Sequence, residues 1–153
     1  MDDEWSSSTL LHIYTDASDL GLGCVFNSHW FAVEFDDAER NMIIAWRELY
    51  AIILACFTWG ENFTGKKILM HCDNQTIVDI VQSGTTRNRD IMCLVRVLFH
   101  ICVRYNFDMR IVYIPGLVNL AADRLSRLNY EAFFTDKSTY FDDLPTPCRR
   151  SFD

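Results

Sequence analysis

Apolar runs alternate with polar breaks along most of the chain, and their spacing predicts the secondary structure. The run at residues 10–18 is apolar and aromatic enough to be a strand buried on both faces, in the middle of a sheet. Two shorter runs follow, at residues 22–26 and 30–35, separated by the tight turn Asn27-Ser28. We expect these three strands to form an antiparallel meander.

The rest of the chain predicts helices that alternate with two more strands. The clearest helix is expected at residues 44–59, where apolar residues recur at helical spacing until Gly60 ends the run. The later elements are, in order, a strand at 66–72, helices at 76–82 and 90–105, a strand at 109–114 and a helix at 119–128. The side chains expected on the buried face of the helix at 90–105 are Met92, Val95, Phe99, Cys102 and Val103.

The order β-β-β-α-β-α-α-β-α favours a single α/β domain with a five-stranded mixed sheet flanked by helices. Three strands are antiparallel neighbours, and two more are joined through helical crossovers and should lie parallel to the first. We place this domain at residues 10–128. Residues 1–9 are expected to be a flexible lead, and residues 129–153 a loosely attached tail or linker.

Composition predicts a globular protein and its cellular location. The chain has 153 residues, half of them hydrophobic, which suits one globular domain. No apolar run reaches membrane-spanning length and the start of the chain is acidic, so we expect no membrane association and an intracellular location, in cytoplasm or nucleus. The six cysteines show neither CxxC nor zinc-ligand spacing, which indicates reduced thiols.

The net charge of −7 argues against a general nucleic-acid binder, because affinity for phosphates comes mostly from Lys and Arg. Two divalent cations would add four charges and bring the sum to −3. Such a surface would still attract nucleic acid only weakly.

Carboxylates at the ends of two predicted strands are candidate metal ligands. Asp16 and Asp73 close strands that should be parallel neighbours, at the sheet edge where α/β folds place their sites. Glu48 could join them from the crossover helix and Asp123 from the last helix. Taken singly, Asp16 could cap a turn, and Glu48 could pair with Arg47 or face water. Clustered together, such acids need cations to remain ionised, and their oxygens suit Mg²⁺ or Mn²⁺.

Four segments, in order, resemble the acidic motifs of ribonuclease H domains. They are Tyr14-Thr15-Asp16-Ala17-Ser18, Arg47-Glu48-Leu49-Tyr50-Ala51, His71-Cys72-Asp73-Asn74-Gln75 and Asn119-Leu120-Ala121-Ala122-Asp123-Arg124-Leu125-Ser126-Arg127. The likeness is strongest to the domains attached to retroelement reverse transcriptases, Ty3/gypsy-like or DIRS-like, and covers about residues 10–128.

The resemblance implies a ribonuclease H-like fold and an activity. Asp16, Glu48, Asp73 and Asp123 would bind two Mg²⁺ ions, which Mn²⁺ could replace. The implied reaction is two-metal-ion cleavage of the RNA strand of RNA–DNA hybrids during reverse transcription. The resemblance also implies a polymerase domain upstream in a parent polyprotein.

Five further residues are candidates for contacting the hybrid. Asn74 and Gln75 could bind minor-groove edges or 2′-hydroxyls, although Asn74 is equally suited to cap a helix. Ser18 could contact a phosphate or close its own turn. Arg87 and Arg89 lie in the connector where relatives place a hybrid-binding helix, and they could equally be ordinary surface charges.

The sequence departs from cellular ribonucleases H in two places. Residues 116–119 contain no His where many of those enzymes carry one in a loop, and residues 85–89 replace their basic helix. Other nucleases of this fold are disfavoured. Integrase relatives need a Glu where this chain has Asp108, and exonuclease relatives begin with Asp-x-Glu where this chain has Asp16-Ala17-Ser18. The alternative from another class is a non-catalytic structural or interaction domain of a retroelement-derived protein.

Overall fold

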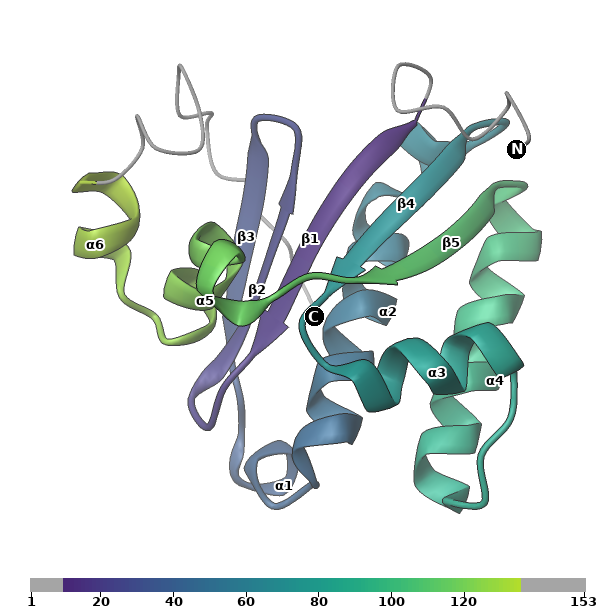
Figure 1. Cartoon of the computed structure of the whole chain (residues 1–153), viewed down its shortest axis with the longest axis horizontal. Coiled ribbons are helices and arrows are strands. Elements are labelled where there is room, and N and C mark those ends of the chain that lie inside the picture. The colour runs from purple at the N-terminus through teal and green to yellow at the C-terminus, as the bar shows by residue number, and fades with distance from the viewer. Residues whose placement is uncertain (1–9, 136–153) are drawn as a thin grey trace.

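The structure, a computed structural model, describes residues 10–135. Five strands form one sheet in the order β3-β2-β1-β4-β5 (Figure 1). The strands are β1 (Leu11–Ala17), β2 (Gly21–Phe26), β3 (His29–Glu34), β4 (Lys67–Cys72) and β5 (Asp108–Tyr113). β1, β2 and β3 are antiparallel neighbours, whereas β4 pairs parallel to both β1 and β5. The predicted mixed sheet is confirmed.

Helices cover both faces of this sheet (Figure 1). They are α1 (Asp37–Arg40), α2 (Ile44–Phe63), α3 (Gln75–Ser83), α4 (Arg89–Tyr105), the 3₁₀ turn η2 (Gly116–Val118), α5 (Leu120–Ser126) and α6 (Tyr130–Thr135). The long helices α2 and α4 pack against each other behind the sheet, while α5 lies in front of β1 and β2. The main core therefore lies between the sheet and α2, and a smaller core lies under α5 and α6.

Alternation along β1 assigns its side chains to these two cores. Ile13 is fully buried in the main core, whereas Tyr14 packs against the smaller core. Because side chains of a strand alternate between faces, Asp16 leaves β1 on the same face as Tyr14. The end of β1 thus presents a carboxylate on the face that carries α5.

Helix α2 is longer than its periodicity predicts, because Gly60 does not end it. A Cβ at Gly60 would lie 2.5 Å from Cδ2 of Tyr105, so glycine is needed there for the close approach of α4. The helix continues to Phe63, whose side chain is fully buried. The apolar pattern after Gly60 is too short to show this continuation in the sequence.

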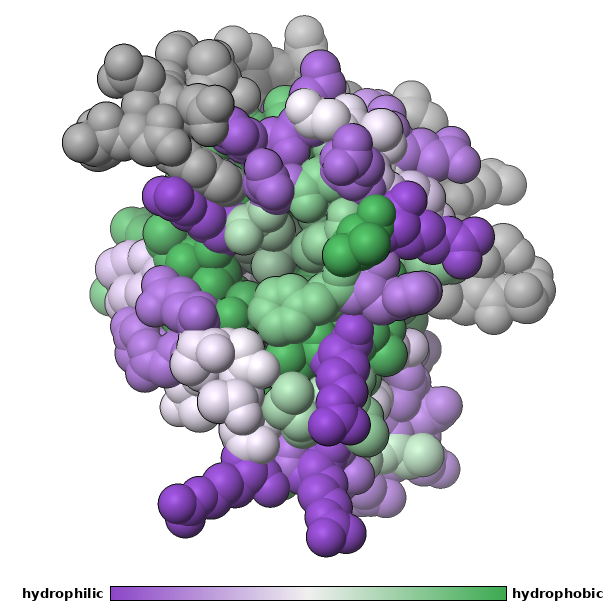
Figure 2. All heavy atoms as spheres, turned by 90° about the vertical axis from the view of Figure 1, so that its right-hand side faces the viewer, coloured by the Kyte–Doolittle hydropathy of each residue, from purple (hydrophilic) through white to green (hydrophobic). Residues whose placement is uncertain are grey.

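The buried face of α4 matches the predicted one only in part: Val95 is buried as expected, and Met92 and Cys102 are partly buried against the core. The buried residues of this helix are Ile91, Val95, Leu98 and Ile101. Phe99 and Val103, expected in the core, are 41% and 79% exposed. Apolar residues occur nearly all round this helix, so more than one face satisfies a helical period. The view toward α4 and β5 shows apolar surface surrounded by polar residues (Figure 2).

Residues 130–135 differ most from expectation, because they form α6 rather than part of a loosely attached tail. Phe133 is fully buried, and its ring centroid lies 5.1 Å from that of Trp30. Both belong to the small core with Val25 and Leu125. A helix of six residues is too short for its period to be recognised. The expected lead at 1–9 and the rest of the tail lie outside the described residues.

Two predictions from the composition, on membrane association and on the cysteines, concern residues 10–135. Within residues 10–135, no helix is both long enough and apolar enough to cross a membrane. Cys24, Cys56 and Cys72 are buried as thiols, whereas Cys93 is exposed. Burial raises the pKa of the Cys102 thiol to about 11, so it stays protonated at neutral pH.

Candidate metal centre

Three carboxylates converge at the edge of the sheet where β1 and β4 end. The parallel register pairs Thr15 with Cys72, so Asp16 and Asp73, the residues that follow, come side by side. Glu48 reaches the same point from α2, which crosses behind β1. One oxygen of each carboxylate lies within 4.8 Å of the other two, and Asp16 and Glu48 are both buried.

No pairing between Glu48 and Arg47 forms here. The Arg47 guanidinium turns toward the β1–β2 turn, where Nη1 donates to the Ser18 carbonyl and, at 3.1 Å, to Oδ1 of Asp19. The Oε2 atom of Glu48 is buried without a hydrogen-bond partner. An unpaired buried carboxylate oxygen is unfavourable, so a bound cation or proton would stabilise this site.

The pKa values of the three acids are raised, in each case chiefly by burial. Burial raises the pKa of Asp16 to about 8, and the neighbouring charge of Asp73 contributes to the rise. Burial, followed by the charges of Asp16 and Asp73, raises the pKa of Glu48 to about 10. Burial also raises the pKa of Asp73. Each shift has the direction that a cation at the site would reverse.

Asp123, the fourth predicted ligand, lies at the border of this cluster. It comes from α5, and its Oδ1 forms an ion pair of 3.1 Å with Nε of Arg127, four residues further along at the C-cap of that helix. Its charge still contributes to raising the pKa of Asp16. The structure therefore brings three predicted ligands together. The fourth, Asp123, lies next to them and is paired with the Arg127 guanidinium.

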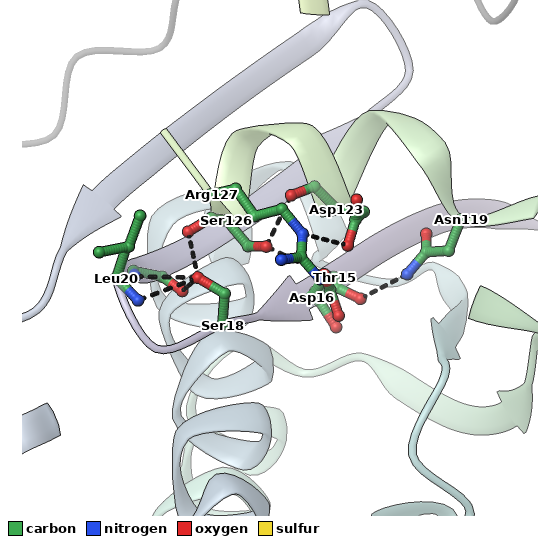
Figure 3. A network of polar contacts seen from close by, with 9 residues as sticks. Thr15, Asp16, Ser18, Leu20, Asn119, Asp123, Ser126 and Arg127 are labelled. Carbon is green, nitrogen blue, oxygen red and sulfur yellow. Dashed lines mark hydrogen bonds and ion pairs between the residues drawn. The ribbon is translucent and has the colours of Figure 1, made fainter. Parts of the chain in front are cut away.

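Hydrogen bonds fasten α5 to the end of β1 (Figure 3). Nδ2 of Asn119 donates to the Thr15 carbonyl at 2.9 Å, and Oγ of Ser18 donates to the Ser126 carbonyl at 2.7 Å. Oγ of Ser126 lies 3.0 Å from Oδ2 of Asp16. Asn119 and Ser126 are buried. Neither residue has a role that is evident from the sequence; the available signal is their spacing, four residues before and three after Asp123.

Asn74 and Gln75 lie where α3 begins, directly after Asp73. Oδ1 of Asn74 accepts from the Ile77 backbone N–H at 3.2 Å, so Asn74 caps the helix. Gln75 is exposed, and its Nε2 donates to Oδ1 of Asp79 at 2.8 Å.

The other three candidates for contacting the hybrid are Ser18, Arg87 and Arg89. The Ser18 hydroxyl accepts from the backbone N–H groups of Leu20 and Gly21, at 3.0 and 3.3 Å, and closes its turn as well as binding α5. Arg87 lies in the connector between α3 and α4, and Arg89 begins α4; both are exposed.

The residues of the cluster fit a hard divalent cation. All its donors are carboxylate oxygens, the ligands that Mg²⁺ and Mn²⁺ prefer, and one of them lacks any partner. Asp16, Glu48 and Asp73 are the side chains that would hold such an ion.

The fold and the position of these acids define the class of protein. An RNase H1 from Halobacterium salinarum matches 80% of this chain and 98% of its own, with a TM-score of 0.63 and 18% identity. LC11-RNase H1, solved in complex with an RNA/DNA hybrid, matches 81% of this chain and 99% of its own, with a TM-score of 0.66 and 17% identity. The chain has the ribonuclease H fold.

The family within this class follows from the sequence. The family model described as an RNase H-like domain found in reverse transcriptase matches residues 6–100. The chain belongs to this family, and the resemblance predicted from the motifs is confirmed. The match ends before Asp123, so α5 is placed by the structure alone.

Relatives of the chain are parts of larger proteins. The retrovirus-related Pol polyprotein from transposon 297 of Drosophila melanogaster is 29% identical over an alignment of 125 residues, and the match covers 76% of this chain and 11% of that polyprotein. The foamy viral protease-reverse transcriptase, solved with an RNA/DNA hybrid, matches 86% of this chain and 21% of its own, with a TM-score of 0.59 and 15% identity. The chain spans about a tenth of its polyprotein relative.

Proposed function

We propose that the chain is a metal-dependent endonuclease that cleaves the RNA strand of RNA–DNA hybrids during reverse transcription. The observation that carries this proposal is the cluster of Asp16, Glu48 and Asp73, whose carboxylate oxygens lie within 4.8 Å of one another in a reverse-transcriptase RNase H-like domain. Two of its structural neighbours are solved with RNA/DNA hybrids, which supports the same class of substrate here.

Four acids would hold the metal ions, three of them from the cluster and one from α5. Asp16, Glu48 and Asp73 bind through oxygens that already lie close together. Asp123, which is paired with Arg127 in this structure, would be the fourth ligand. Two bound Mg²⁺ or Mn²⁺ ions would activate water and stabilise the leaving oxygen of a phosphodiester.

The side-chain amides of Asn74 and Gln75, at the N-terminus of α3, are suited to recognise RNA. Capping uses only Oδ1 of Asn74, so the two amide hydrogens of its Nδ2 remain for a substrate. Gln75 uses Nε2 toward Asp79 and keeps Oε1 as an acceptor. A 2′-hydroxyl both donates and accepts, so this pair matches the feature that distinguishes RNA from DNA. The Ser18 hydroxyl is engaged with Ser126 and its turn, so we assign Ser18 to turn closure.

Arg87 and Arg89 supply positive charge for the phosphates of the hybrid. Because the chain carries a net charge of −7, we expect this contact to be weak and the isolated domain to need low salt or high concentration. A polymerase domain in the parent polyprotein would hold the same hybrid and raise its effective concentration at this site.

Removal of one ligand tests this function. Asp73→Asn takes away a metal ligand and a like charge together, so the metal-free variant should melt at the same temperature as the unmodified chain or higher. It should not cleave an RNA–DNA hybrid in Mg²⁺, because the ligand set is incomplete. Gel analysis of a labelled hybrid, with the melting temperature measured in parallel, provides both readouts.

Glu61→Gln is the matched control, because it removes an exposed carboxylate of α2 outside the cluster. This variant should cleave like the unmodified chain. Cleavage retained by Asp73→Asn would contradict the assignment. A folded, unmodified chain that cleaves nothing in either Mg²⁺ or Mn²⁺ would favour the non-catalytic interaction domain.

A further inference from the structure

We propose that Ser126 is a positioning residue of the metal centre, whose buried hydroxyl holds the Asp16 carboxylate and ties it to the helix that carries Asp123. The inference deepens the proposed function and rests on it. Figure 3 shows the arrangement: Ser126 stands at the end of α5, between Asp16 of β1 and the backbone of its own helix.

The Ser126 hydroxyl has two acceptors and one hydrogen. Its Oγ lies 3.0 Å from Oδ2 of Asp16 and 2.7 Å from the Asp123 carbonyl. The Asp123 carbonyl also accepts the Arg127 backbone N–H at 3.1 Å, so it stays paired when the hydroxyl turns away. An ionised carboxylate is the stronger acceptor of the two. The hydrogen is therefore available to Asp16 once that side chain acts as a metal ligand.

The framework around Ser126 makes this contact rigid. Asp16 pairs with Gly23 of β2, and a Cβ at Gly23 would lie 2.8 Å from the Ser126 backbone nitrogen. The absence of a side chain there lets α5 lie directly on the strand. Ser18 binds the Ser126 carbonyl at one end of α5, and Asn119 binds the Thr15 carbonyl at the other. The helix is thus attached to β1 on both sides of Asp16.

This geometry gives the hydroxyl a specific task. A hydrogen bond to one carboxylate oxygen fixes the rotation of the carboxylate, and therefore the direction of the other oxygen. Alanine would fill the same buried space without a polar atom, so packing alone does not require serine. The partner of the hydroxyl outside its own helix is Asp16, one of the three clustered acids. Ser126 does not itself need to touch metal or substrate.

Ser126→Ala, in the full chain, tests the proposal. The readout is the Mg²⁺ concentration that gives half of the Mg²⁺-induced rise in melting temperature. We expect this midpoint to increase about tenfold or more, the range seen when groups that orient metal ligands are removed. Cleavage should fall at limiting Mg²⁺ and recover in excess Mg²⁺, with an unchanged KM for the hybrid.

Two further variants separate positioning from stability. Ser126→Cys keeps a weak donor in nearly the same volume and should give an intermediate midpoint, which also serves if Ser126→Ala does not fold. Thr58→Ala removes a hydroxyl that binds the Leu54 carbonyl within α2, at 2.6 Å, and should leave the Mg²⁺ midpoint unchanged.

The outcomes distinguish this inference from the proposed function. An unmodified chain with no Mg²⁺-dependent rise in melting temperature would overturn the metal centre itself. A normal rise in the unmodified chain, with the same midpoint in both Ser126 variants, would overturn only the role of Ser126. A midpoint shifted in Ser126→Ala and partly restored in Ser126→Cys is the result that the geometry predicts.

Discussion

Asp16 and Glu48 are the two buried carboxylates of the proposed metal centre. Burying an ionised carboxylate without a partner is unfavourable by several kcal/mol, so these groups take up either protons or a cation. Their pKa values, about 8 and about 10, lie above the ordinary range of carboxylic acids. The folded, metal-free protein therefore binds more protons than the unfolded chain does. Its stability should fall as pH rises from the ordinary pKa values of these acids through pH 8.

The pH dependence of stability tests this charge state. Between pH 6.5 and 8, in EDTA, the free energy of unfolding should fall by about 1.4 kcal/mol per pH unit for each carboxyl group that is protonated only in the fold. Glu48→Gln should make the fall shallower, and Mg²⁺ should reduce it. Urea titrations at both pH values measure the effect, and equal stabilities in EDTA would contradict the charge state.

His71 sets the lower limit of that pH range. Burial, followed by the neighbouring His12, lowers the pKa of His71 to about 4. Below pH 6.5 the unfolded chain therefore gains a proton that the fold resists, and His71 lowers stability as pH falls. As pH rises above 6.5 the imidazole becomes neutral in the unfolded chain as well, so the carboxyl groups dominate the change.

Among the elements, α5 and α6 together cover the outer face of the antiparallel half of the sheet. Leu125 and Phe133 are fully buried against Val25 and Trp30 of that face. Because α5 carries Asp123 and Ser126, the packing of α6 also stabilises the helix that borders the metal centre. The segment at 130–135 is therefore part of the folded unit that supports the site.

Truncation of one aromatic side chain measures this contribution. Phe133→Ala should lower the free energy of unfolding by about 3–5 kcal/mol, the usual cost of removing a buried phenyl ring. Phe134→Ala, in the same helix but 44% exposed, should have a much smaller effect. Urea denaturation of the two variants gives the comparison. Equal, small losses would mean that α6 is only loosely attached.

The sequence predicted what repeats over many residues or follows from strand order. The long helix α2 and the parallel pairing of β1 with β4 were both accessible in this way, and the pairing accounts for the meeting of Asp16 and Asp73. α6 was not accessible, because its six residues show no period. The roles of Asn119 and Ser126 were missed for another reason: their spacing from Asp123 does not reveal the hydrogen bonds that they make to the end of a distant strand.

At the scale of the whole molecule, net charge opposes the proposed substrate. A domain with a net charge of −7, or −3 with two divalent cations, carries the same sign of charge as a polyanion and attracts it poorly. The chain spans about a tenth of its polyprotein relative, so the affinity it lacks could come from a neighbouring domain. In the proposed function, recognition of the RNA strand comes from this domain, through Asn74 and Gln75.

The measurement that tests the central claim most directly is strand-resolved cleavage by the full chain at low salt in Mg²⁺. The substrate is an RNA–DNA hybrid with a different label on each strand, run beside duplex DNA of the same sequence. We predict internal cuts in the RNA strand of the hybrid, an intact DNA strand and intact duplex DNA. Cuts in the duplex DNA as frequent as those in the RNA strand would contradict the claim and indicate another nuclease of this fold.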